Sequence, residues 1–355
     1  MKILYITRFF PKDYYGGGEQ YIFEIWKIAR EKYETYLLSG WVNNPKLLPK
    51  GTKCVDLSSE SRVARYSRLY NASKKYIEEI KPDLIHTNTV EIPTTKIPTI
   101  ATYHHFEHLK KLSLFGIIRR TLVVNKLNMF SKIITVSNSS KNGLVKLGVN
   151  SSKITVIHDG VDVKKFSPKI VRNKKFVISC IFRISSEKGQ DVVVNAIGRL
   201  SQNVKNNIEV EIVGYVSDKR YFDYIVTRAR KFKLPIKFIT NVPDLVKYYQ
   251  KSDLVLFPTL LNEGFGIVAC EAMSCGKPLI ASNHSSIREV VGNCALLVKP
   301  NDSEELSNAI MKVYSDRKLA AKLGKCGRKR VLKMFNWDKS FNLHENVYRE
   351  VLRKQ

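Results

Sequence analysis

The chain has 355 residues, 44% of them hydrophobic, which is enough to form the cores of two domains. Lys and Arg outnumber Asp and Glu by 60 to 32, and the resulting net charge of +28 bears on partners and solubility but not on fold. No segment approaches the ~18 uncharged apolar residues of a membrane-spanning helix, and the six cysteines show neither a C-x-x-C pair nor a His-linked metal spacing. We interpret the cysteines as reduced core thiols and leave open one disulfide.

The chain starts with a strand, a glycine-rich turn and a helix. Residues 2–7 are an apolar run that predicts a strand, and Arg8 with no small-residue cleavage site after it argues against a signal peptide. The loop that follows contains Gly16, Gly17 and Gly18, and then apolar residues recur at helical spacing. The dinucleotide fingerprint G-x-G-x-x-G is absent, so no nicotinamide site is predicted. A glycine triplet alone is equally typical of a flexible turn.

Strand and helix patterns keep alternating after this start. Strands are predicted at 35–38 and 82–86, with a polar helix at 63–80. The segment 100–106 is predicted to be another strand that runs into a polar loop. Alternation without a repeat favours a parallel sheet covered on both faces. His86 ends one strand and is interpreted as structural. His104, His105 and His108 follow the next strand, but their irregular spacing does not favour a metal site, so none is predicted.

Residues 101–150 are strongly basic, with eight Lys or Arg and the single acid Glu107. Within them, the segment 109–132 interleaves apolar and basic residues. One interpretation is a pair of helices that cover the domain and have a solvated basic side. The other is a membrane-surface element whose cations contact anionic lipid while apolar residues enter the headgroup region.

The segment 166–175 loses periodicity, and we place the domain linker there. The predicted domains are therefore 1–167 and 168–339. The second begins with a strand at 176–182, which is followed by Arg183 and Lys188. A planar guanidinium and an ammonium at a strand end can converge on a diphosphate, although both also occur as ordinary surface cations. Further alternation predicts a second doubly wound sheet.

The stretch 253–282 predicts a strand, a loop, a helix and a strand. Residues 254–257 suit a strand buried on both faces, and Pro258 ends it. Gly264 and Gly266 flank Phe265 where the helical pattern begins, so the backbone there can approach a ligand closely and present N–H groups to an anion. A phosphate is the ligand that this arrangement favours.

Two carboxylates frame that helix start, Glu263 in the loop and Glu271 in the helix. Without a ligand, Glu263 is explained as an acid at a helix N-terminus and Glu271 as a solvated helix position. However, Glu271 lies among apolar and small neighbours, so its carboxylate needs a partner.

The run from Glu263 to Leu279, Glu-Gly-Phe-Gly-Ile-Val-Ala-Cys-Glu-Ala-Met-Ser-Cys-Gly-Lys-Pro-Leu, closely resembles the Glu-x7-Glu signature of retaining glycosyltransferase family 4. The resemblance extends over nearly the whole chain, with departures at Asn88, Asp159, Phe182 and 282–286. It implies an α/β fold of two Rossmann-like domains facing a cleft, called GT-B. It also implies that the C-terminal helix 340–355 packs back on the first domain, which would bind the acceptor.

The resemblance also implies roles for individual residues. Glu263 and His104 would orient the transferred sugar, and Glu271 would hold the nucleotide ribose. The donor diphosphate would lie against Arg183 and Lys188. The remaining donor-binding candidates are backbone positions of the two glycine-rich loops: Gly16, Gly17, Gly18, Gly264, Phe265 and Gly266.

The implied activity is a retaining transfer of a hexose from a nucleoside-diphosphate sugar, without metal or further cofactor. The implied acceptor is a lipid-linked or surface glycan. The predicted location is the cytoplasm, with peripheral contact to an anionic inner membrane face through 109–132. Alternatives are a nucleic-acid-binding protein, a non-catalytic sugar-nucleotide-binding protein, and an epimerase or phosphorylase of similar architecture. Nucleic acid is disfavoured because no zinc-finger or helix-turn-helix signature is present.

Overall fold

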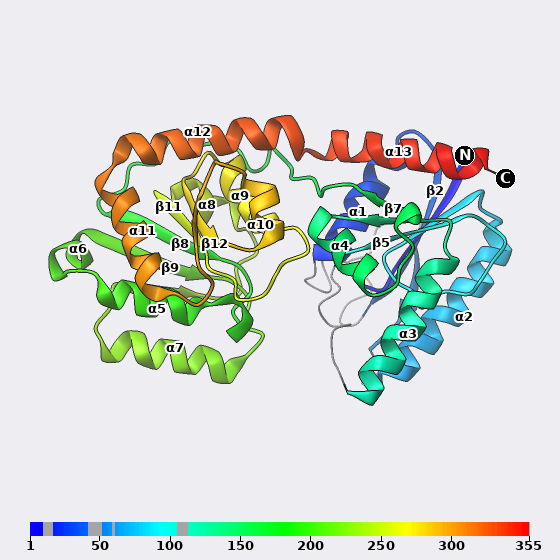
Figure 1. Cartoon of the computed structure of the whole chain (residues 1–355), viewed down its shortest axis with the longest axis horizontal. Coiled ribbons are helices and arrows are strands. Elements are labelled where there is room, and N and C mark those ends of the chain that lie inside the picture. Colours follow the sequence, from blue (N-terminus) through cyan, green and yellow to red (C-terminus); the bar gives the residue numbers. More distant parts are fainter. Residues whose placement is uncertain (10–16, 42–51, 59–60, 105–112, 355) are drawn as a thin grey trace. The chain divides into compact units, whose positions relative to one another are not determined.

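The computed structural model describes residues 1–9, 17–41, 52–58, 61–104 and 113–354 (Figure 1). The chain divides into two compact units, Met1–Gly160 with Trp337–Gln355, and Val161–Asn336. The first crossing between them therefore falls after Gly160, seven residues before the predicted boundary at 167, and the chain returns to the first unit at Trp337.

The first unit is a parallel sheet with helices. Over the described ranges its strand order is β3-β2-β1-β4-β5-β6-β7. The strands are β1 (Lys2–Thr7), β2 (Glu34–Trp41), β3 (Lys53–Asp56), β4 (Leu84–Thr87), β5 (Thr99–Tyr103), β6 (Lys132–Thr135) and β7 (Ile154–Val156). The helices are α1 (Gly17–Ala29), α2 (Arg62–Ile80), α3 (Leu114–Met129), α4 (Asn138–Lys146) and α13 (Trp337–Arg353).

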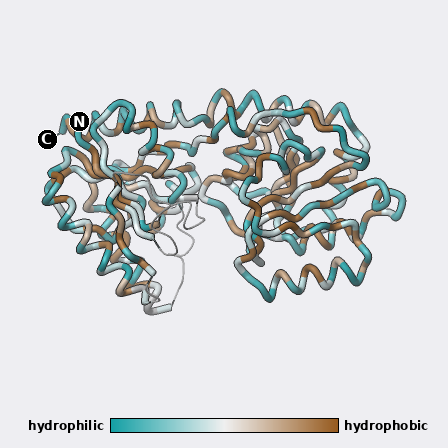
Figure 2. Tube along the Cα trace, turned by 180° about the vertical axis from the view of Figure 1, so that it is seen from behind, coloured by the Kyte–Doolittle hydropathy of each residue, from teal (hydrophilic) through white to brown (hydrophobic). Residues whose placement is uncertain are grey.

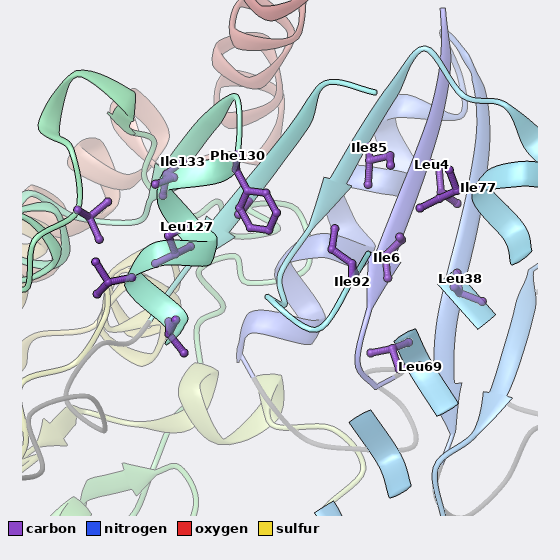
Figure 3. Packing of buried hydrophobic residues seen from close by; sticks show 14 of the residues in the cluster. Leu4, Ile6, Leu38, Leu69, Ile77, Ile85, Ile92, Leu127, Phe130 and Ile133 are labelled. Carbon is purple, nitrogen blue, oxygen red and sulfur yellow. The ribbon is translucent and has the colours of Figure 1, made fainter. Parts of the chain in front are cut away.

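Both faces of this sheet are buried, as β1 illustrates. Leu4 and Ile6 belong to one apolar cluster with Ile77 of α2 and Leu127 of α3 (Figure 3). Side chains alternate along a strand, so Tyr5 points to the opposite face. There its hydroxyl lies 3.3 Å from the hydroxyl of Tyr348 in α13. The C-terminal helix of the chain therefore covers the second face of the first sheet.

The second unit repeats this architecture, with the strand order β10-β9-β8-β11-β12-β13 in the described residues. The strands are β8 (Phe176–Ile181), β9 (Ile208–Val213), β10 (Ile236–Ile239), β11 (Leu254–Phe257), β12 (Leu279–Ser282) and β13 (Leu296–Val298). The helices are α5 (Gln190–Arg199), α6 (Gln202–Asn207), α7 (Lys219–Lys231), α8 (Val246–Lys251), α9 (Ile267–Ser274), α10 (Ser285–Val291), α11 (Ser303–Ser315) and α12 (Arg317–Met334).

The central strands of the second unit are buried throughout and mostly apolar. Every residue of β8 and β11 is buried, which agrees with a parallel strand covered on both faces. In Figure 2 these strands run as brown segments inside the unit, whereas the outer helices carry more teal. Helix α9 packs against α12, and α5 packs against α7 and α11.

Each sheet has one point where the strand order reverses, between β1 and β4 in the first unit and between β8 and β11 in the second. Open α/β sheets bind ligands at such a point, beyond the carboxyl ends of the strands. The segments that follow these four strands contain Gly17 and Gly18 at the start of α1, Asn88, the Arg183–Lys188 segment and Glu263. The topology therefore places the predicted motifs where a ligand is expected in each unit.

Candidate functional site

The loop after β8 is held close to the end of β11 by a glycine. Residues Ser186–Lys188 form a short 3₁₀ helix that ends at Gly189, whose φ is +73°. A Cβ atom at Gly189 would lie 2.2 Å from the carbonyl oxygen of Pro258, so no larger residue fits. The backbone of Leu260 also donates to the carbonyl of Glu187 at 2.9 Å. These contacts place Lys188 beside the loop that contains Glu263.

Lys188 and Glu263 form an ion pair, with 2.5 Å between Nζ and Oε1. The two side chains are only 17% and 21% exposed, so solvent screens the pair less than a typical surface pair. The hydroxyl of Thr259 donates to the same carboxylate oxygen at 3.0 Å. Two residues that the sequence assigned to the diphosphate and to the sugar are thus in direct contact, 75 positions apart in the chain.

Arg183 lies at the same end of β8 but is more exposed. Its guanidinium pairs with the carboxylate of Glu187, four residues on, and its side chain is 47% exposed. The buried Gln190 donates to the carbonyl of Arg183 at 2.9 Å and fixes the backbone there. The guanidinium is therefore accessible, and a stronger anion can replace Glu187 as its partner.

Helix α9 starts at Ile267, directly after Gly266, as the sequence predicts. Gly266 has a φ of +100°, and a Cβ there would lie 2.6 Å from the Cδ1 atom of Ile287. The backbone N–H groups of the first turn of a helix have no partner within the helix, and they favour an anion. Phe265 is a core residue, 3% exposed and packed edge to face on Phe335, so its ring is not accessible to a ligand.

Glu271, in the middle of α9, has the partner that the sequence analysis required. The hydroxyl of the buried Tyr249 in α8 donates to its Oε2 atom at 2.7 Å. Burial raises the pKa of Glu271 to about 7, and the Tyr249 hydrogen bond opposes that shift. The carboxylate consequently changes charge near neutral pH, which is typical of functional sites.

In the first unit, the glycine-rich loop and His104 come together. Gly17 begins α1, and Gly16 lies outside the described residues, as do His105 and His108. A Cβ on Gly18 would lie 3.1 Å from Cδ2 of His104, so the glycine permits a close approach of helix start and imidazole. Asn88 fixes this helix start by donating to the carbonyl of Gly18 at 3.1 Å.

Behind His104 lies a buried network of tyrosines and histidines. His86 is enclosed, with Nδ1 at 2.7 Å from the hydroxyl of Tyr348 and Nε2 at 2.7 Å from that of Thr102. Burial lowers its pKa well below the usual value, so it is neutral and structural, as predicted. The Tyr21 ring connects the network to His104, with centroids 4.7 Å apart in an edge contact.

Asp159 is a buried acid in the loop after β7, 8% exposed. Burial raises the pKa of its carboxyl well above the usual value, and its Oδ1 atom has no hydrogen-bond partner in the part of the chain that the structure describes. Over the same residues, no group of three His, Cys, Asp or Glu side chains is placed to hold a metal ion.

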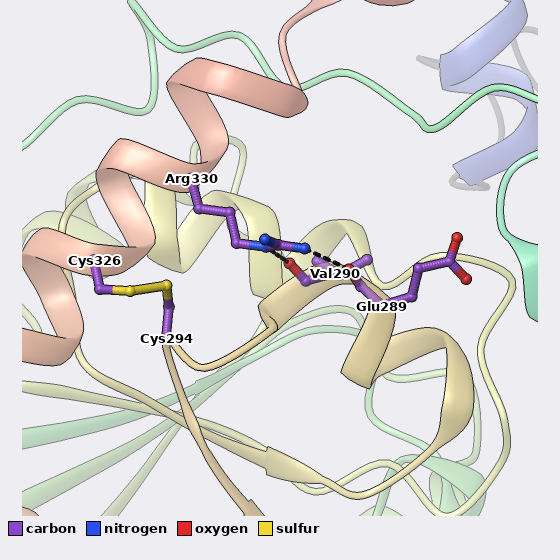
Figure 4. The surroundings of a disulfide bond; sticks show 5 residues. All are labelled: Glu289, Val290, Cys294, Cys326 and Arg330. Atoms are coloured by element: carbon purple, nitrogen blue, oxygen red, sulfur yellow. Dashed lines mark hydrogen bonds between the residues drawn. A yellow bond between two sulfur atoms is a disulfide. The ribbon is translucent and has the colours of Figure 1, made fainter.

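A disulfide joins Cys294 to Cys326, with 5.2 Å between their Cα atoms (Figure 4). The interpretation as reduced thiols is therefore wrong for these two cysteines, and the open possibility of one disulfide is realised. The sequence could not show that α12 brings Cys326 next to the turn before β13. One turn further along α12, Arg330 donates to the carbonyls of Glu289 and Val290 in α10.

Helix α10 in turn supports the loop of Glu263. The hydroxyls of Ser285 and Ser286 donate to Oδ1 of Asn262 at 3.4 and 3.1 Å, and Nε2 of His284 lies 3.1 Å from the carbonyl of Thr259. The segment 282–286, where the sequence departs from the family pattern, thus contacts two residues of the loop that leads into Glu263.

The basic segment 109–132 is described from residue 113 onward; Lys110 and Lys111 lie outside the described residues. From 114 it is one helix, α3, which buries Val123, Val124 and Leu127 in the core. On its outer side four large apolar side chains are exposed, by 38 to 65%: Ile117, Ile118, Leu122 and Met129. None of the described helices combines the length and the hydropathy that crossing a membrane requires.

Five contacting residues were not predicted as part of either site: Glu187, Tyr249, Thr259, Tyr21 and Asn88. Three of them, Tyr249, Tyr21 and Asn88, are connected through side-chain hydrogen bonds or ring contacts to residues distant in the chain. Thr259 lies only four positions before Glu263, but a threonine at that spacing is no sign of a contact. Only Glu187 carried a local signal, because it stands four positions after Arg183 at the spacing of an ion pair.

Two family models match the chain. Residues 162–330 match Glycosyl transferases group 1, and residues 15–165 match Glycosyltransferase Family 4. Each half of the chain is thus similar to a domain found in glycosyltransferases, and the boundary between the two matches lies close to the boundary between the two structural units.

Curated relatives are also glycosyltransferases. The chain is 25% identical over 327 residues to UDP-Gal:alpha-D-GlcNAc-diphosphoundecaprenol alpha-1,3-galactosyltransferase of Escherichia coli, covering 84% of this chain and 82% of the relative. It is 27% identical over 216 residues to MMP alpha-(1->4)-mannosyltransferase of Mycolicibacterium hassiacum, covering 58% of this chain and 51% of the relative. The chain thus spans about half the length of the latter, and of other relatives such as D-inositol 3-phosphate glycosyltransferase of Paenarthrobacter aurescens, at 53%.

Solved structures confirm the fold. Sucrose-phosphate synthase from Thermosynechococcus elongatus superposes with a TM-score of 0.86 at 21% identity, with complete coverage of both chains. HepE of Anabaena, determined in complex with UDP and glucose, gives a TM-score of 0.82 at 20% identity and covers 99% of this chain and 100% of its own. The predicted fold of two Rossmann-like domains, the GT-B class, is therefore confirmed.

Proposed function

We propose that the chain is a glycosyltransferase that moves a hexose from a nucleoside-diphosphate sugar to an acceptor with retention of configuration. The observation that carries the proposal is the ion pair of Lys188 and Glu263 at the ends of β8 and β11, next to the start of α9. In one place, this arrangement brings together Lys188 as a cation for the diphosphate, Glu263 as an acid for the sugar, and the start of α9 as a binding position for an anion. The matches of both halves to glycosyltransferase models support it.

The donor diphosphate is the leaving group, and its charge has to be stabilised as the bond to the sugar breaks. We assign this task to Lys188, Arg183 and the backbone N–H groups that start α9. Fixed donors in a shielded site stabilise developing charge more than donors in water do. Because these groups supply positive charge without a metal, we also propose that the transfer needs no divalent cation.

Lys188 and Arg183 hold carboxylate partners, Glu263 and Glu187, that a diphosphate would replace. Once Lys188 turns to the phosphate, Glu263 is released to accept hydrogen bonds from hydroxyls of the sugar. Glu263 can therefore bind the sugar only when a phosphate has taken its place on Lys188. Glu271 is assigned to the ribose hydroxyls, with Tyr249 holding its carboxylate in place.

During transfer, the bond between the anomeric carbon and the diphosphate oxygen breaks, and a bond to an acceptor hydroxyl oxygen forms. The diphosphate leaves with the electron pair of the broken bond, and one of its oxygens takes up the proton of the acceptor hydroxyl. His104, held between Gly18 and the Tyr21 ring, is assigned to orient the sugar. The close approach of Gly18 to this imidazole explains why a side chain at that position would displace it.

For the acceptor we propose a lipid-linked glycan, presented at an anionic membrane surface that α3 contacts from the cytoplasmic side. The exposed apolar side chains of α3 stand next to Arg119 and Arg120. Lys126 contributes less, because its ammonium donates to Thr94 at 3.0 Å. The named substrate of the Escherichia coli relative, a sugar on diphosphoundecaprenol, supports this acceptor class.

The donor part is tested by thermal unfolding of the purified chain with a panel of nucleoside diphosphates and their sugars. A ligand at 100 times its Kd stabilises the native state by about 2.7 kcal/mol. At least one base is expected to raise Tm, and Lys188→Met is expected to remove that rise. A panel that leaves Tm unchanged throughout would argue against a nucleotide-sugar site.

The membrane part is tested by co-sedimentation with anionic and neutral liposomes at low and high salt. Each Lys or Arg near an anionic leaflet contributes about 1 kcal/mol. Arg119→Glu with Arg120→Glu is therefore expected to reduce binding to anionic liposomes, and salt is expected to weaken it. The matched control is Lys74→Glu with Lys75→Glu on the exposed side of α2. Equal binding of both double variants, or equal binding to both liposome types, contradicts the proposal.

A further inference from the structure

The second unit contains a hollow of about 370 Å³ between α7 and β10, and most of the side chains that line it are apolar. Phe222, Val226 and Ala229 contribute from α7, and Ile236 and Phe238 from β10. The rings of Phe222 and Phe238 meet edge to face, with centroids 5.7 Å apart. The volume is at the lower end of the 300–1,000 Å³ that is usual for sites of small molecules. Helix α7 lies at the outside of the unit, next to α5 (Figure 1).

The sequence of α7 explains why the hollow has a charged rim. Phe222, Val226 and Ala229 recur at i, i+4 and i+7 and so share one face, and Arg230 lies at i+8 on that same face. The helix ends at Lys231, and Lys233 has a φ of +48° in the turn toward β10. Arg230 and Lys233 both line the hollow and are both exposed.

Most of the cations around the hollow, including these two, have no charged partner among the described residues. Residues 219–237 carry seven Lys or Arg and one acid, Asp223. Lys219 pairs with Asp223 at 2.6 Å, and Lys237 pairs with Glu209 at 2.8 Å. Among the residues that the structure describes, no acidic side chain forms an ion pair with Arg230 or Lys233. Two unpaired positive charges thus border a cavity lined otherwise by hydrocarbon and phenyl groups.

We propose that this hollow binds an anionic lipid, whose apolar chain packs against Val226 and Phe238 and whose phosphate lies on Arg230 and Lys233. Apart from the two cations, the lining offers no side chain that forms hydrogen bonds, so the bound part inside has to be apolar. The two cations at the rim favour a negative charge at the other end of the ligand. This inference does not depend on glycosyl transfer, and it concerns a different surface from α3.

An acidic peptide is the competing occupant, because β10 is the outermost strand of its sheet in the described residues. However, β10 has four residues, and its second, Lys237, is exposed and charged. Short edge strands that carry lysine resist the addition of another strand. A lipid uses the hollow and its rim without needing that edge.

The experiment is calorimetric titration of the full chain with decyl phosphate below its micelle concentration. Decyl maltoside, inorganic phosphate and an acidic peptide with one Phe serve as comparison ligands. Decyl phosphate is expected to bind, and the other three at least tenfold more weakly. The double variant Arg230→Glu with Lys233→Glu is expected to weaken the binding of decyl phosphate at least tenfold. Val226→Trp is also expected to weaken this binding, because the larger side chain fills the hollow.

The matched control is Lys318→Glu with Lys322→Glu, which changes charge equally on the exposed side of α12 in the same unit. It is expected to bind decyl phosphate as the unchanged chain does. The proposal is overturned by absent binding, by equal loss in both double variants, or by inorganic phosphate binding as tightly as decyl phosphate. Tighter binding of the peptide would replace the lipid by a protein partner and overturn it too.

Discussion

Replacing Lys188 by Met tests the donor assignment most specifically, because it removes the ammonium and keeps an apolar stem of similar length. Hydrogen bonds to charged groups contribute about 1.5–3 kcal/mol, and 1.36 kcal/mol corresponds to a tenfold change in an equilibrium constant. If Lys188 contacts the diphosphate, the Kd of a nucleoside diphosphate is expected to rise about 10- to 150-fold. Isothermal titration calorimetry measures this change directly.

The other residue of the ion pair, Glu263, provides a second variant for which the opposite change in diphosphate binding is expected. Glu263 accepts from Lys188 at 2.5 Å and therefore competes with a phosphate for the ammonium. Glu263→Gln removes that competition, so the diphosphate is expected to bind at least as tightly as before. Lys219→Met is a matched control, since it breaks an ion pair of 2.6 Å in the same unit, and it is expected to leave the Kd unchanged. Unchanged binding in Lys188→Met, or equal weakening in Glu263→Gln, would refute the reasoning.

Four further predictions concern particular groups. Because burial raises the pKa of Glu271 to about 7, its carboxyl loses its proton as pH rises from 6 to 8. The ionised form accepts hydrogen bonds that are about 1 kcal/mol stronger, so the affinity for a nucleotide sugar is expected to rise about fivefold over this range. Glu271→Gln is expected to abolish this pH dependence. Because the pKa of Glu271 is higher in the folded chain than in the unfolded chain, this group contributes stability that is fully present below about pH 4.5 and is lost as pH rises through 7. Urea unfolding of the unchanged chain and of Glu271→Gln, from acid to neutral pH, measures this contribution. Cys294→Ser with Cys326→Ser opens a loop of 32 residues and is expected to destabilise the second unit by about 3–4 kcal/mol in urea unfolding; coincident curves would contradict this. Transfer activity is expected to persist in EDTA, and its loss with recovery on adding magnesium or manganese would contradict the metal-free assignment.

The sequence predicted the fold because buried parallel strands leave continuous apolar runs. The predicted strand 254–257 and the helix start after Gly266 coincide with the structure, since Pro258 and the glycines mark both ends of the loop. Strand order could not be read from these local patterns. The contact of Lys188 with Glu263 depends on that order, because it exists only where β8 and β11 are neighbours.

Side-chain partners were the least predictable part of the site. Tyr249 lies in α8, a helix of six residues with little periodicity, so nothing local connected it to Glu271. Phe265 stands between two glycines and looks like a loop residue that meets a ligand, yet packing against Phe335 buries it. The disulfide likewise depends on how α12 lies over the turn that contains Cys294.

The measurement that tests the central claim most directly is release of nucleoside diphosphate from nucleotide sugars by the unchanged chain and by Glu263→Gln. For at least one nucleotide sugar, the unchanged chain is expected to release diphosphate, faster with a lipid-linked acceptor present. Glu263→Gln is expected to be slower by orders of magnitude while it still binds the diphosphate. Release at the same rate by both proteins, or by neither across the panel, would contradict the assignment of this site to glycosyl transfer.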